Sequence, residues 1–345
     1  MRICFFANMS GHENWPELFD KVEFYRVDIR LLRELGHDVV LAGRPTGLDC
    51  KADLFYCWWW GHAPFALALG ALLRKPVLVT GAFDYATCRE EIPGLCYLDR
   101  PFWQKIVLKT ILRCADVNLF ISKYEYDEVL ANLKVRNPIL APLAIDTDFY
   151  NPGDALAQSD YFFAVSWTSK TNAIRKGLPQ TIDAFAQVAA EFPAVRLILA
   201  GKPGDFLDTL RAQAKKLGVE KKVEFVGMIS DEKKRNYYRH CIAYVQPTLY
   251  EGFGHAIAEA VSCGAPVVAS NRGAVPEVAG RFAQCVEPKD VGAIATAMAG
   301  CIDREKTWAE VHAAHAWVVD HYSMNARRSH LSRILEKWTP DKLLV

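Results

Sequence analysis

The chain has 345 residues, of which 51% are hydrophobic and 23% are charged, and its formal net charge is +1. This is the composition of a folded globular protein with enough residues for two domains, and it excludes a disordered chain. The near balance of charges creates no global field that would favour a nucleic-acid partner.

The cysteines and the apolar runs indicate where in the cell the protein is expected. The ten cysteines are scattered without a C-x-x-C pair, which is typical of reduced, buried thiols in a cytosolic protein and speaks against a disulfide framework or a zinc site. The apolar run at residues 2–7 fits a first strand better than a signal peptide. No run reaches the roughly 18 apolar residues of a membrane span. We therefore expect a cytoplasmic protein, soluble or bound peripherally at the inner membrane.

The first half of the chain alternates short apolar runs with helical patterns. The apolar runs predict strands at residues 2–7, 38–42, 53–59, 76–80, 117–121 and 139–141. Amphipathic segments between them predict helices that include residues 22–35, 65–73 and 124–133. Continuous apolar strands that alternate with helices are typical of a doubly wound parallel sheet.

A second unit of the same kind follows a linker. Residues 151–160, NPGDALAQSD, interrupt the alternation with Pro, Gly and polar residues. The pattern then returns, with strands predicted at 161–166, 196–200, 223–226, 243–246 and 266–269, and helices that include 179–191 and 206–217. We therefore predict the α/β class, with two Rossmann-like domains that face each other across a cleft, where the carboxyl ends of the strands bind a ligand.

The most informative segment is residues 251–269, EGFGHAIAEAVSCGAPVVA. Glu251 stands in a loop, and Gly252 and Gly254 allow the backbone to approach a ligand closely. A helix that begins near Gly254 directs its amide groups and its positive dipole end at that place, which favours a phosphate. Glu259 follows about two turns along the helix. Carboxylates beside a diphosphate pair best with hydroxyl groups, as on a sugar and a ribose.

This segment resembles the Glu-(seven residues)-Glu motif of the retaining GT-B glycosyltransferases of family 4. Other segments similar to the family are PLAIDTDFYNP at 142–152, SNRGAVPEVAG at 270–280 and HYSM at 321–324. The resemblance implies a GT-B fold with an acceptor domain at 1–150, a nucleotide-sugar domain at 151–322 and a C-terminal helix at 323–345 that returns to the first domain. It also implies retaining transfer of a hexose from a UDP- or GDP-sugar to a glycan, lipid-linked or small-molecule acceptor, as in polysaccharide biosynthesis.

The leaving diphosphate needs cations, because negative charge accumulates on it during transfer. Residues 170–177, KTNAIRKG, are predicted to form a loop with three cations before a helix, and Lys176-Gly177 matches the phosphate-binding Lys-Gly of the family. The family's Arg after the preceding strand is absent, because the chain reads VSWTSK there. Lys170 or Arg175 is expected to take its place.

The resemblance assigns roles to individual residues. Glu251 and Lys176 are predicted to be catalytic, with Glu251 at the donor sugar and Glu259 at the ribose. His62, which follows a strand ending in three tryptophans, is expected to approach the donor sugar and is the third predicted catalytic residue. The other predicted donor-binding residues are Lys170, Arg175, Gly227, Met228, Ile229, Phe253, Gly254, His255 and Ala256.

We expect no metal ion and no cofactor besides the nucleotide-sugar co-substrate. Asp146-Thr147-Asp148 has the D-x-D spacing of a divalent-metal site, but it lies in a segment similar to the family's linker, where Phe149 and Pro152 account for it. The resemblance implies a front-face reaction without a covalent nucleophile, in which the leaving phosphate accepts the proton of the acceptor.

Two other functions compete with this interpretation. A catalytically inactive nucleotide-sugar binding module would also explain the missing Arg and the first loop, residues 8–20, which lacks the family's Gly-rich pattern. A nicotinamide-dependent dehydrogenase agrees with two Rossmann-like halves but needs G-x-G-x-x-G after a strand, which this chain lacks.

Residues 101–113, PFWQKIVLKTILR, predict a helix with a second possible role. Its cations recur every four residues, at Lys105, Lys109 and Arg113. Its opposite side is expected to carry Phe102, Ile106 and Ile111. Such a helix would suit a membrane that holds a lipid-linked acceptor. The alternative is a helix that covers the sheet and has a solvated basic face.

Overall fold

The computed structural model describes residues 1–89, 92–154 and 156–338. The chain forms two compact units. Unit 1 consists of Met1–Ala86, Gly94–Ala144 and Tyr322–Val345, and unit 2 consists of Thr87–Pro93 and Ile145–His321. Ala155 of the predicted linker and residues 339–345 of the predicted C-terminal helix lie outside the described residues.

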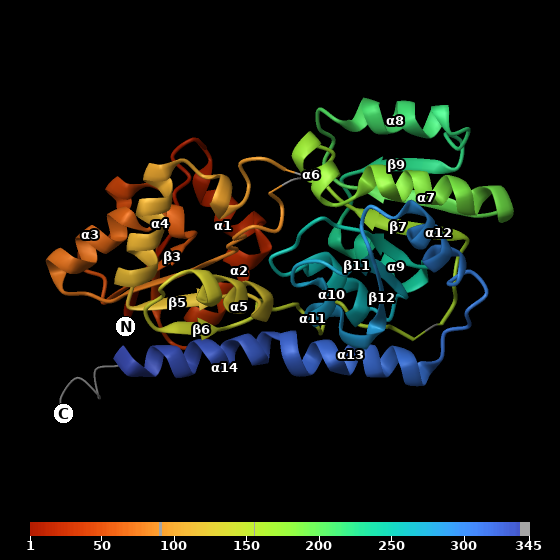
Figure 1. Cartoon of the computed structure of the whole chain (residues 1–345). Coiled ribbons are helices and arrows are strands. Elements are labelled where there is room, and N and C mark those ends of the chain that lie inside the picture. Colours follow the sequence, from red (N-terminus) through yellow and green to blue (C-terminus); the bar gives the residue numbers. More distant parts are fainter. Residues whose placement is uncertain (90–91, 155, 339–345) are drawn as a thin grey trace. The chain divides into compact units, whose positions relative to one another are not determined.

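Unit 1 is built on a parallel sheet with the strand order β2-β1-β3-β4-β5-β6 in the described part of the chain (Figure 1). Its strands are β1 (Arg2–Phe6), β2 (Asp38–Ala42), β3 (Leu54–Trp58), β4 (Val77–Gly81), β5 (Val117–Phe120) and β6 (Pro138–Leu140). Its helices are α1 (Trp15–Lys21), α2 (Glu23–Glu34), α3 (Pro64–Leu73), α4 (Phe102–Cys114), α5 (Lys123–Asn132) and α14 (Met324–Leu335). The strand order reverses between β1 and β3, and ligands of doubly wound sheets bind at the carboxyl edge of such a switch point.

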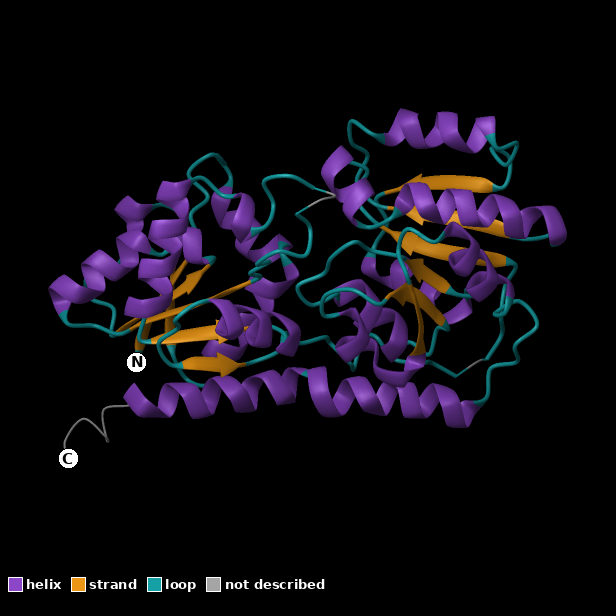
Figure 2. Ribbon diagram, in the orientation of Figure 1, coloured by secondary structure: helices purple, strands orange, loops and turns teal. Residues whose placement is uncertain are grey.

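Unit 2 repeats this architecture of parallel strands flanked by helices (Figure 2). Its strand order is β12-β11-β10-β7-β8-β9 among its described residues. Its strands are β7 (Tyr161–Val165), β8 (Arg196–Ala200), β9 (Val223–Gly227), β10 (Tyr244–Gln246), β11 (Val267–Ser270) and β12 (Ala283–Val286). Its helices are α6 (Lys170–Arg175), α7 (Leu178–Glu191), α8 (Leu207–Lys216), α9 (Asp231–His240), α10 (His255–Ser262), α11 (Val275–Ala279), α12 (Val291–Ala299) and α13 (Trp308–Tyr322). Its switch point lies between β7 and β10.

Burial on both faces of each sheet explains the continuous apolar strands in the sequence. Phe5 and Phe6, which point to opposite faces of β1, are both fully buried. In unit 2, α7 buries Ile182, Phe185 and Ala189 with helical spacing in the core that it shares with β8. The predicted α/β class is therefore confirmed.

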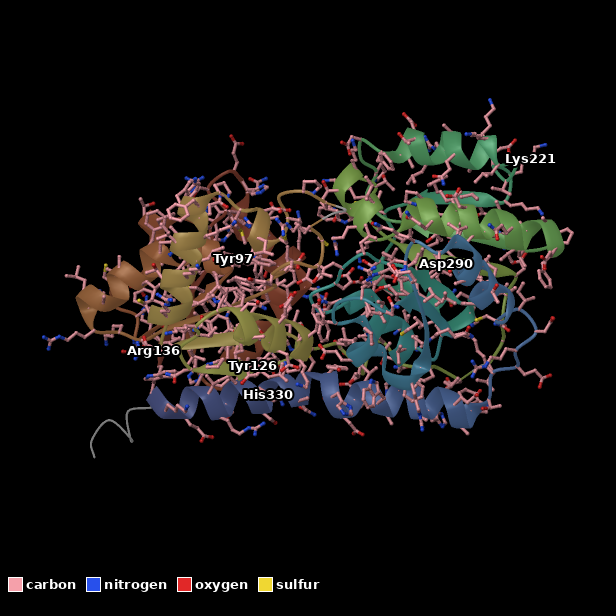
Figure 3. The ribbon with its side chains drawn as sticks, in the orientation of Figure 1. Tyr97, Tyr126, Arg136, Lys221, Asp290 and His330 are labelled. Atoms are coloured by element: carbon pink, nitrogen blue, oxygen red, sulfur yellow. The ribbon has the colours of Figure 1, made fainter. Side chains whose placement is uncertain are left out.

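Side-chain caps fix where several helices begin. Ser230 accepts a hydrogen bond from the amide of Lys233 at 3.2 Å at the start of α9. Asp290, labelled in Figure 3, accepts one from the amide of Ala293 at 2.9 Å at the start of α12. Each cap satisfies an amide that the first helical turn leaves without an intrahelical partner. Gly264, at φ +72°, follows the end of α10, a position where a left-handed glycine commonly ends a helix.

One predicted loop proved to be a helix. Residues 170–175 form α6, although this segment was expected to be irregular. The side chain of Asp205, which follows β8, accepts a hydrogen bond from the amide of Lys170 at 2.8 Å. The start of α6 is therefore capped by a residue 35 positions away, and such a tertiary contact leaves no local signal.

The C-terminal helix α14 is held in unit 1 by a buried ion pair. Arg327 donates from Nε and Nη2 to the two carboxylate oxygens of Asp28 on α2, at 3.0 and 2.9 Å. Tyr56 on β3 donates to Asp28 at 2.7 Å and lies 3.2 Å from Arg327 Nη2. Arg327 also donates to the carbonyls of Ala141 and Pro142. The burial of both charges is thus accompanied by a nearly complete set of hydrogen bonds.

Candidate active site

Three of the predicted donor-site residues meet at the carboxyl edge of the unit 2 sheet. Glu251 lies in the loop after β10, and Arg175 and Lys176 lie at the end of α6 in the connection after β7. Since β7 and β10 are parallel neighbours, both connections leave the sheet at the same edge, on either side of the switch point.

Two cations share one carboxylate oxygen in this site. Lys176 Nζ lies 3.1 Å and Arg175 Nη1 lies 3.2 Å from Oε1 of Glu251. Gln246, the last residue of β10, donates from Nε2 to the same oxygen at 2.9 Å and accepts from Lys176 Nζ at 3.4 Å. Two cations and one carboxylate leave one net positive charge in a largely buried place, which is suited to binding an anion.

The charge of Glu251 is maintained by its neighbours. Burial raises the pKa of this carboxyl, but Lys176 and Arg175 outweigh burial and lower the pKa to about 2. Glu251 is therefore ionised near neutral pH. A group with this pKa is poorly suited to general acid–base catalysis, and it acts instead as a fixed anion that positions both cations.

Arg175 also joins the two connections through their main chains. Its Nη1 donates to the carbonyl of Tyr250 at 2.9 Å, and its own carbonyl accepts from the amide of Leu249 at 2.7 Å. Thr248 Oγ1 donates to the same Arg175 carbonyl at 2.8 Å. The loop that carries Glu251 is thus bonded to the end of α6 through both the side chain and the carbonyl of Arg175.

A close backbone contact explains why glycine follows Lys176. Gly177 has φ +70°, and a Cβ at this position would lie 2.2 Å from the carbonyl oxygen of Pro247. Only glycine adopts this backbone conformation readily and leaves room for that oxygen. The Lys-Gly pair therefore brings the Lys176 backbone directly against the loop that follows β10.

The first turn of α10 stands next to Glu251. Gly254, at φ +99°, is the N-cap of α10, so the predicted donor-binding residues His255 and Ala256 form its first turn, where a helix presents amides to anions. The ring of buried Phe253 lies 5.2 Å from that of His255. The Glu251 carbonyl accepts from the amide of Ala274 at 3.0 Å, which holds the loop in place.

Glu259 lies on the second turn of α10 in a polar cluster of its own. Tyr238 on α9 donates to its Oε2 at 2.9 Å, and Lys234 on α9 lies 3.1 Å from both carboxylate oxygens. Burial lowers the pKa of Lys234, but Glu259 and Asp231 outweigh burial and raise it, so the ammonium group stays charged. Lys234 and Tyr238 were not among the predicted residues, because nothing in the sequence shows that α9 packs against α10.

The structure brings Arg175, but not Lys170, to the cluster around Glu251. Lys170 is exposed at the opposite end of α6, where its amide is capped by Asp205. Trp167, in the segment VSWTSK from which the family's Arg is absent, is exposed, and Lys202 lies 5.6 Å from its ring centre. Of the two cations that the sequence left open, Arg175 therefore has the geometry to replace the missing Arg.

The predicted donor-binding residues Gly227, Met228 and Ile229 lie at the carboxyl end of β9, at the same edge of the sheet. Gly227 ends β9 at φ +69°, and its carbonyl accepts from the amide of Gly201 at 2.8 Å. Met228 is exposed and Ile229 is half-buried. Because β9 is separated from β10 by β7 and β8, this segment lies along the same edge as Glu251 but on the far side of the switch point.

His62 lies at the switch point of unit 1. It follows β3, and its Nδ1 accepts a hydrogen bond from the amide of Asn8, which follows β1, at 3.2 Å. Burial lowers the pKa of His62, against the opposing effect of a hydrogen bond to the Trp58 backbone, so the imidazole is neutral near pH 7. The preceding Trp59 has φ +72°, a strained conformation that is concentrated at functional sites.

The D-x-D triplet forms a turn. Oδ1 of Asp146 accepts from the amide of Phe149 at 3.0 Å, and the carbonyl of Asp148 accepts from the side chain of Asn151 at 2.6 Å. Across residues 1–89, 92–154 and 156–338, no group of three or more His, Cys, Asp and Glu side chains is arranged to hold a metal ion. Within the same residues, none of the helices combines the length and apolar character needed to cross a bilayer.

Comparisons with known sequences cover the part of the chain that contains these residues. The sequence model of the family "Glycosyl transferases group 1" matches residues 167–315, which include the clusters around Glu251 and Glu259. The O-antigen chain mannosyltransferase B of Escherichia coli is 28% identical over 255 residues, 70% of this chain and 65% of that protein. The GDP-mannose-dependent alpha-(1-6)-phosphatidylinositol monomannoside mannosyltransferase of Mycolicibacterium smegmatis is 28% identical over 320 residues, 86% of this chain and 80% of that protein. The chain thus spans just under two thirds of the first relative's length.

Solved structures share the fold over nearly the whole chain. The Anabaena protein Alr3699/HepE, solved in complex with UDP and glucose, superposes with a TM-score of 0.74 at 18% identity and covers 98% of this chain and 100% of its own. Sucrose-phosphate synthase from Thermosynechococcus elongatus gives a TM-score of 0.68 at 20% identity, over 93% and 79% of the two chains. The fold of this protein is the GT-B fold. The family match and the two mannosyltransferase relatives support a glycosyltransferase.

Proposed function

We propose that this protein is a retaining glycosyltransferase that moves a hexose from a nucleoside-diphosphate sugar to an acceptor hydroxyl. The observation that carries the proposal is the pair Arg175 and Lys176, held together by Glu251 at the switch point and beside the first turn of α10. One net positive charge and a helix N-terminus together suit a diphosphate leaving group.

The reaction that we propose is the one that the resemblance to the retaining glycosyltransferases implies. The bond between C1 of the hexose and the phosphate oxygen breaks, and C1 bonds to the acceptor oxygen on the same face. The acceptor proton passes to an oxygen of the leaving phosphate, so no side chain has to act as a base. Arg175 and Lys176 stabilise the charge that develops on the diphosphate. Glu251 contacts the sugar hydroxyls, and Glu259 with Lys234 contacts the ribose.

The relatives favour GDP-mannose as the donor. Two mannosyltransferases match most of this chain, and one of them is GDP-mannose-dependent. The UDP complexes are of proteins that share the fold at low identity. We therefore rank GDP-mannose before UDP-sugars.

The acceptor class stays as predicted: a glycan, a lipid-linked saccharide or a small molecule, glycosylated in the cytoplasm during polysaccharide biosynthesis. The donor-sugar role of His62 also stays a prediction.

A donor panel tests the proposal. Thermal shift of the full chain with equal concentrations of GDP-mannose, GDP, UDP-glucose and UDP should show the largest stabilisation with GDP-mannose, which amounts to about 2.7 kcal/mol when that concentration is 100 times the Kd of GDP-mannose. Turnover is measured as release of GDP from GDP-mannose in the presence of an acceptor alcohol or saccharide, and NMR of the anomeric centre of the mannoside that forms gives its configuration. Binding without any release of GDP would support the inactive binding module instead. An inverted product would refute retention.

A chelator tests metal independence. We expect GDP release to survive an excess of EDTA, because the diphosphate charge is met by Arg175, Lys176 and the amides of α10. Loss of turnover in EDTA, restored by Mn²⁺ or Mg²⁺, would contradict this expectation. Asp146-Thr147-Asp148 would then be the candidate metal site.

A further inference from the structure

Helix α4 presents apolar and basic side chains on the same face, contrary to the separation that the sequence pattern suggested. Its exposed residues are Phe102, Trp103, Ile106, Lys109, Thr110, Arg113 and Cys114. Positions 102, 106, 109 and 113 follow the spacing of one helix face. Ile111 and Leu112 are buried, and Lys105 donates to the carbonyl of Leu98 at 2.5 Å. The outer face is therefore aromatic at its amino end and cationic at its carboxyl end.

The neighbouring helix α3 adds an apolar surface. Its sequence, PFALALGALL, contains no polar side chain, so its outer face is apolar. The prediction that this helix is amphipathic was therefore wrong. Phe65, Ala68 and Leu72, at helical spacing, are exposed on it. α3 and α4 are in contact and lie side by side on unit 1 (Figure 1).

These two helices concentrate the apolar surface of the molecule. Half of the exposed large hydrophobic side chains among the described residues lie on them: Phe65 (53% exposed), Leu72 (78%), Phe102 (79%), Trp103 (63%) and Ile106 (49%). Single exposed hydrophobic residues are ordinary, but a cluster of this kind marks an interaction surface. An unoccupied surface of this composition would be costly to expose to water.

The charged side chains that these two segments carry have one sign. Residues 64–75 and 101–114 contain five cations, Arg74, Lys75, Lys105, Lys109 and Arg113, and neither Asp nor Glu. Lys75 is paired with Asp53 at 3.4 Å, whereas Arg74, Lys109 and Arg113 are exposed. A positively charged rim beside aromatic side chains matches the headgroup region of an anionic bilayer.

We propose that this α3–α4 surface docks unit 1 on an anionic phospholipid bilayer. Phe102, Trp103 and Ile106 insert into the boundary between headgroups and acyl chains, roughly 5–10 Å deep, while Lys109 and Arg113 contact the phosphates. The apolar face of α3 enters beside them. Tryptophan suits this depth because its ring is apolar and its N–H reaches the polar layer.

The charge pattern favours a bilayer over a second copy of this chain. A two-fold symmetric dimer would place the α3–α4 surface against itself. The cations of the two helices would then face the same cations of the second copy. Since these helices carry neither Asp nor Glu, this repulsion disfavours association. Anionic phospholipid supplies the opposite charge. The inference does not depend on the proposed chemistry, since it concerns only residues of α3 and α4, none of which is assigned to the donor site.

Vesicle sedimentation tests the inference. Wild-type protein should sediment with vesicles made of equal parts phosphatidylcholine and phosphatidylglycerol, and weakly with phosphatidylcholine alone. The triple variant Phe102→Ser/Trp103→Ser/Ile106→Ser should lose binding to both. The variant Lys109→Glu/Arg113→Glu should bind the anionic vesicles at least about tenfold more weakly, since each basic residue near the surface contributes about 1 kcal/mol.

Matched controls lie on unit 2. Trp308→Ser removes a partly exposed tryptophan of α13, and Lys215→Glu/Lys216→Glu reverses two exposed charges in the last turn of α8. Both should bind vesicles like wild type. Thermal melting and GDP calorimetry establish that each variant is folded. If the triple variant does not fold, the inference is tested by Lys109→Glu/Arg113→Glu alone.

Three outcomes would overturn the inference. The first is a wild-type protein that does not sediment with anionic vesicles. The second is folded triple and charge-reversal variants that sediment like wild type. The third is a wild-type dimer by light scattering that the triple variant converts to a monomer, since the surface would then bind a second copy of the chain.

Discussion

The ammonium nitrogen of Lys176 lies 3.1 Å from Oε1 of Glu251, and that same oxygen is approached by Arg175 at 3.2 Å. A single oxygen that holds two cations brings their charges close together, which costs energy that a diphosphate would relieve when it binds. In the function that we propose, the carboxylate thus assembles the anion site in advance of its ligand. Electrostatic preorganisation of this kind is a large contribution to many enzymatic rate enhancements.

The first prediction separates the three cations of residues 170–176. Lys176→Ala and Arg175→Ala should each lower turnover by about a hundredfold or more, because each removes a donor to the developing charge. Lys170→Ala is the matched control and should stay within about threefold of wild type, since Lys170 is exposed at the far end of α6. Steady-state kinetics with GDP-mannose measures all three. A larger loss in Lys170→Ala than in Arg175→Ala would reverse the assignment.

The second prediction concerns Gly177. In Gly177→Ala the new Cβ would meet the carbonyl oxygen of Pro247 at 2.2 Å, at a φ of +70°. Either the β10 loop or α6 must move, so activity should fall at least about tenfold although Lys176 and Glu251 are intact. The control is Gly218→Ala, which has φ +72° but nothing within 4 Å of the new Cβ. It should cost about 1 kcal/mol of stability and leave turnover unchanged. Equal kinetics in the two variants would show that the close contact is unimportant.

The sequence predicts the unit 2 site in part, and the reason for the limit is physical. Local pattern was enough for five of the six strands of unit 2, for the glycine at the start of α10, and for the places of Glu251 in a loop and Glu259 on the helix, because backbone conformation depends on neighbouring residues. The choice between Lys170 and Arg175 depended on α6, whose amide cap, Asp205, comes from another connection. Lys234 and Gln246 were missed because their contacts with the glutamates depend on tertiary packing.

The same limit applies to unit 1 and to the edge of unit 2. Strand β12, AQCV, is short and partly exposed, so its apolar signal is weak. Helix α4 carries apolar residues on more than one side, so periodicity alone could not show that Ile111 is buried while Phe102 is exposed. The hydrogen bond between His62 and Asn8 joins residues 54 positions apart, across the switch point of the sheet, so no local sequence pattern could predict it.

The third prediction is that the two glutamates give different kinetic defects. Glu251→Gln should lower kcat more than it raises KM, because the change disturbs both cations at the bond that breaks. Glu259→Gln should mainly raise KM for the donor, because ribose contacts do not change in the transition state. Calorimetry with GDP separates the two directly. Glu259→Gln that binds GDP as tightly as wild type would refute the ribose assignment.

The last prediction concerns the buried ion pair of α14. Arg327→Leu leaves the carboxylate of Asp28 buried without its cation, and should lower the free energy of unfolding of unit 1 by about 3–5 kcal/mol. The neighbouring Arg328→Leu is the control: Arg328 is partly exposed and pairs with Glu34 at the surface, so its loss should cost at most about 1 kcal/mol. Replacing the cluster as Asp28→Leu/Tyr56→Phe/Arg327→Met should regain part of the loss, because no charge is then left unpaired. Urea unfolding followed by circular dichroism gives the midpoints, and hydrogen exchange of the α14 amides reports detachment of the helix. If Arg327→Leu and Arg328→Leu unfold at the same urea concentration, the ion pair does not anchor α14 to unit 1.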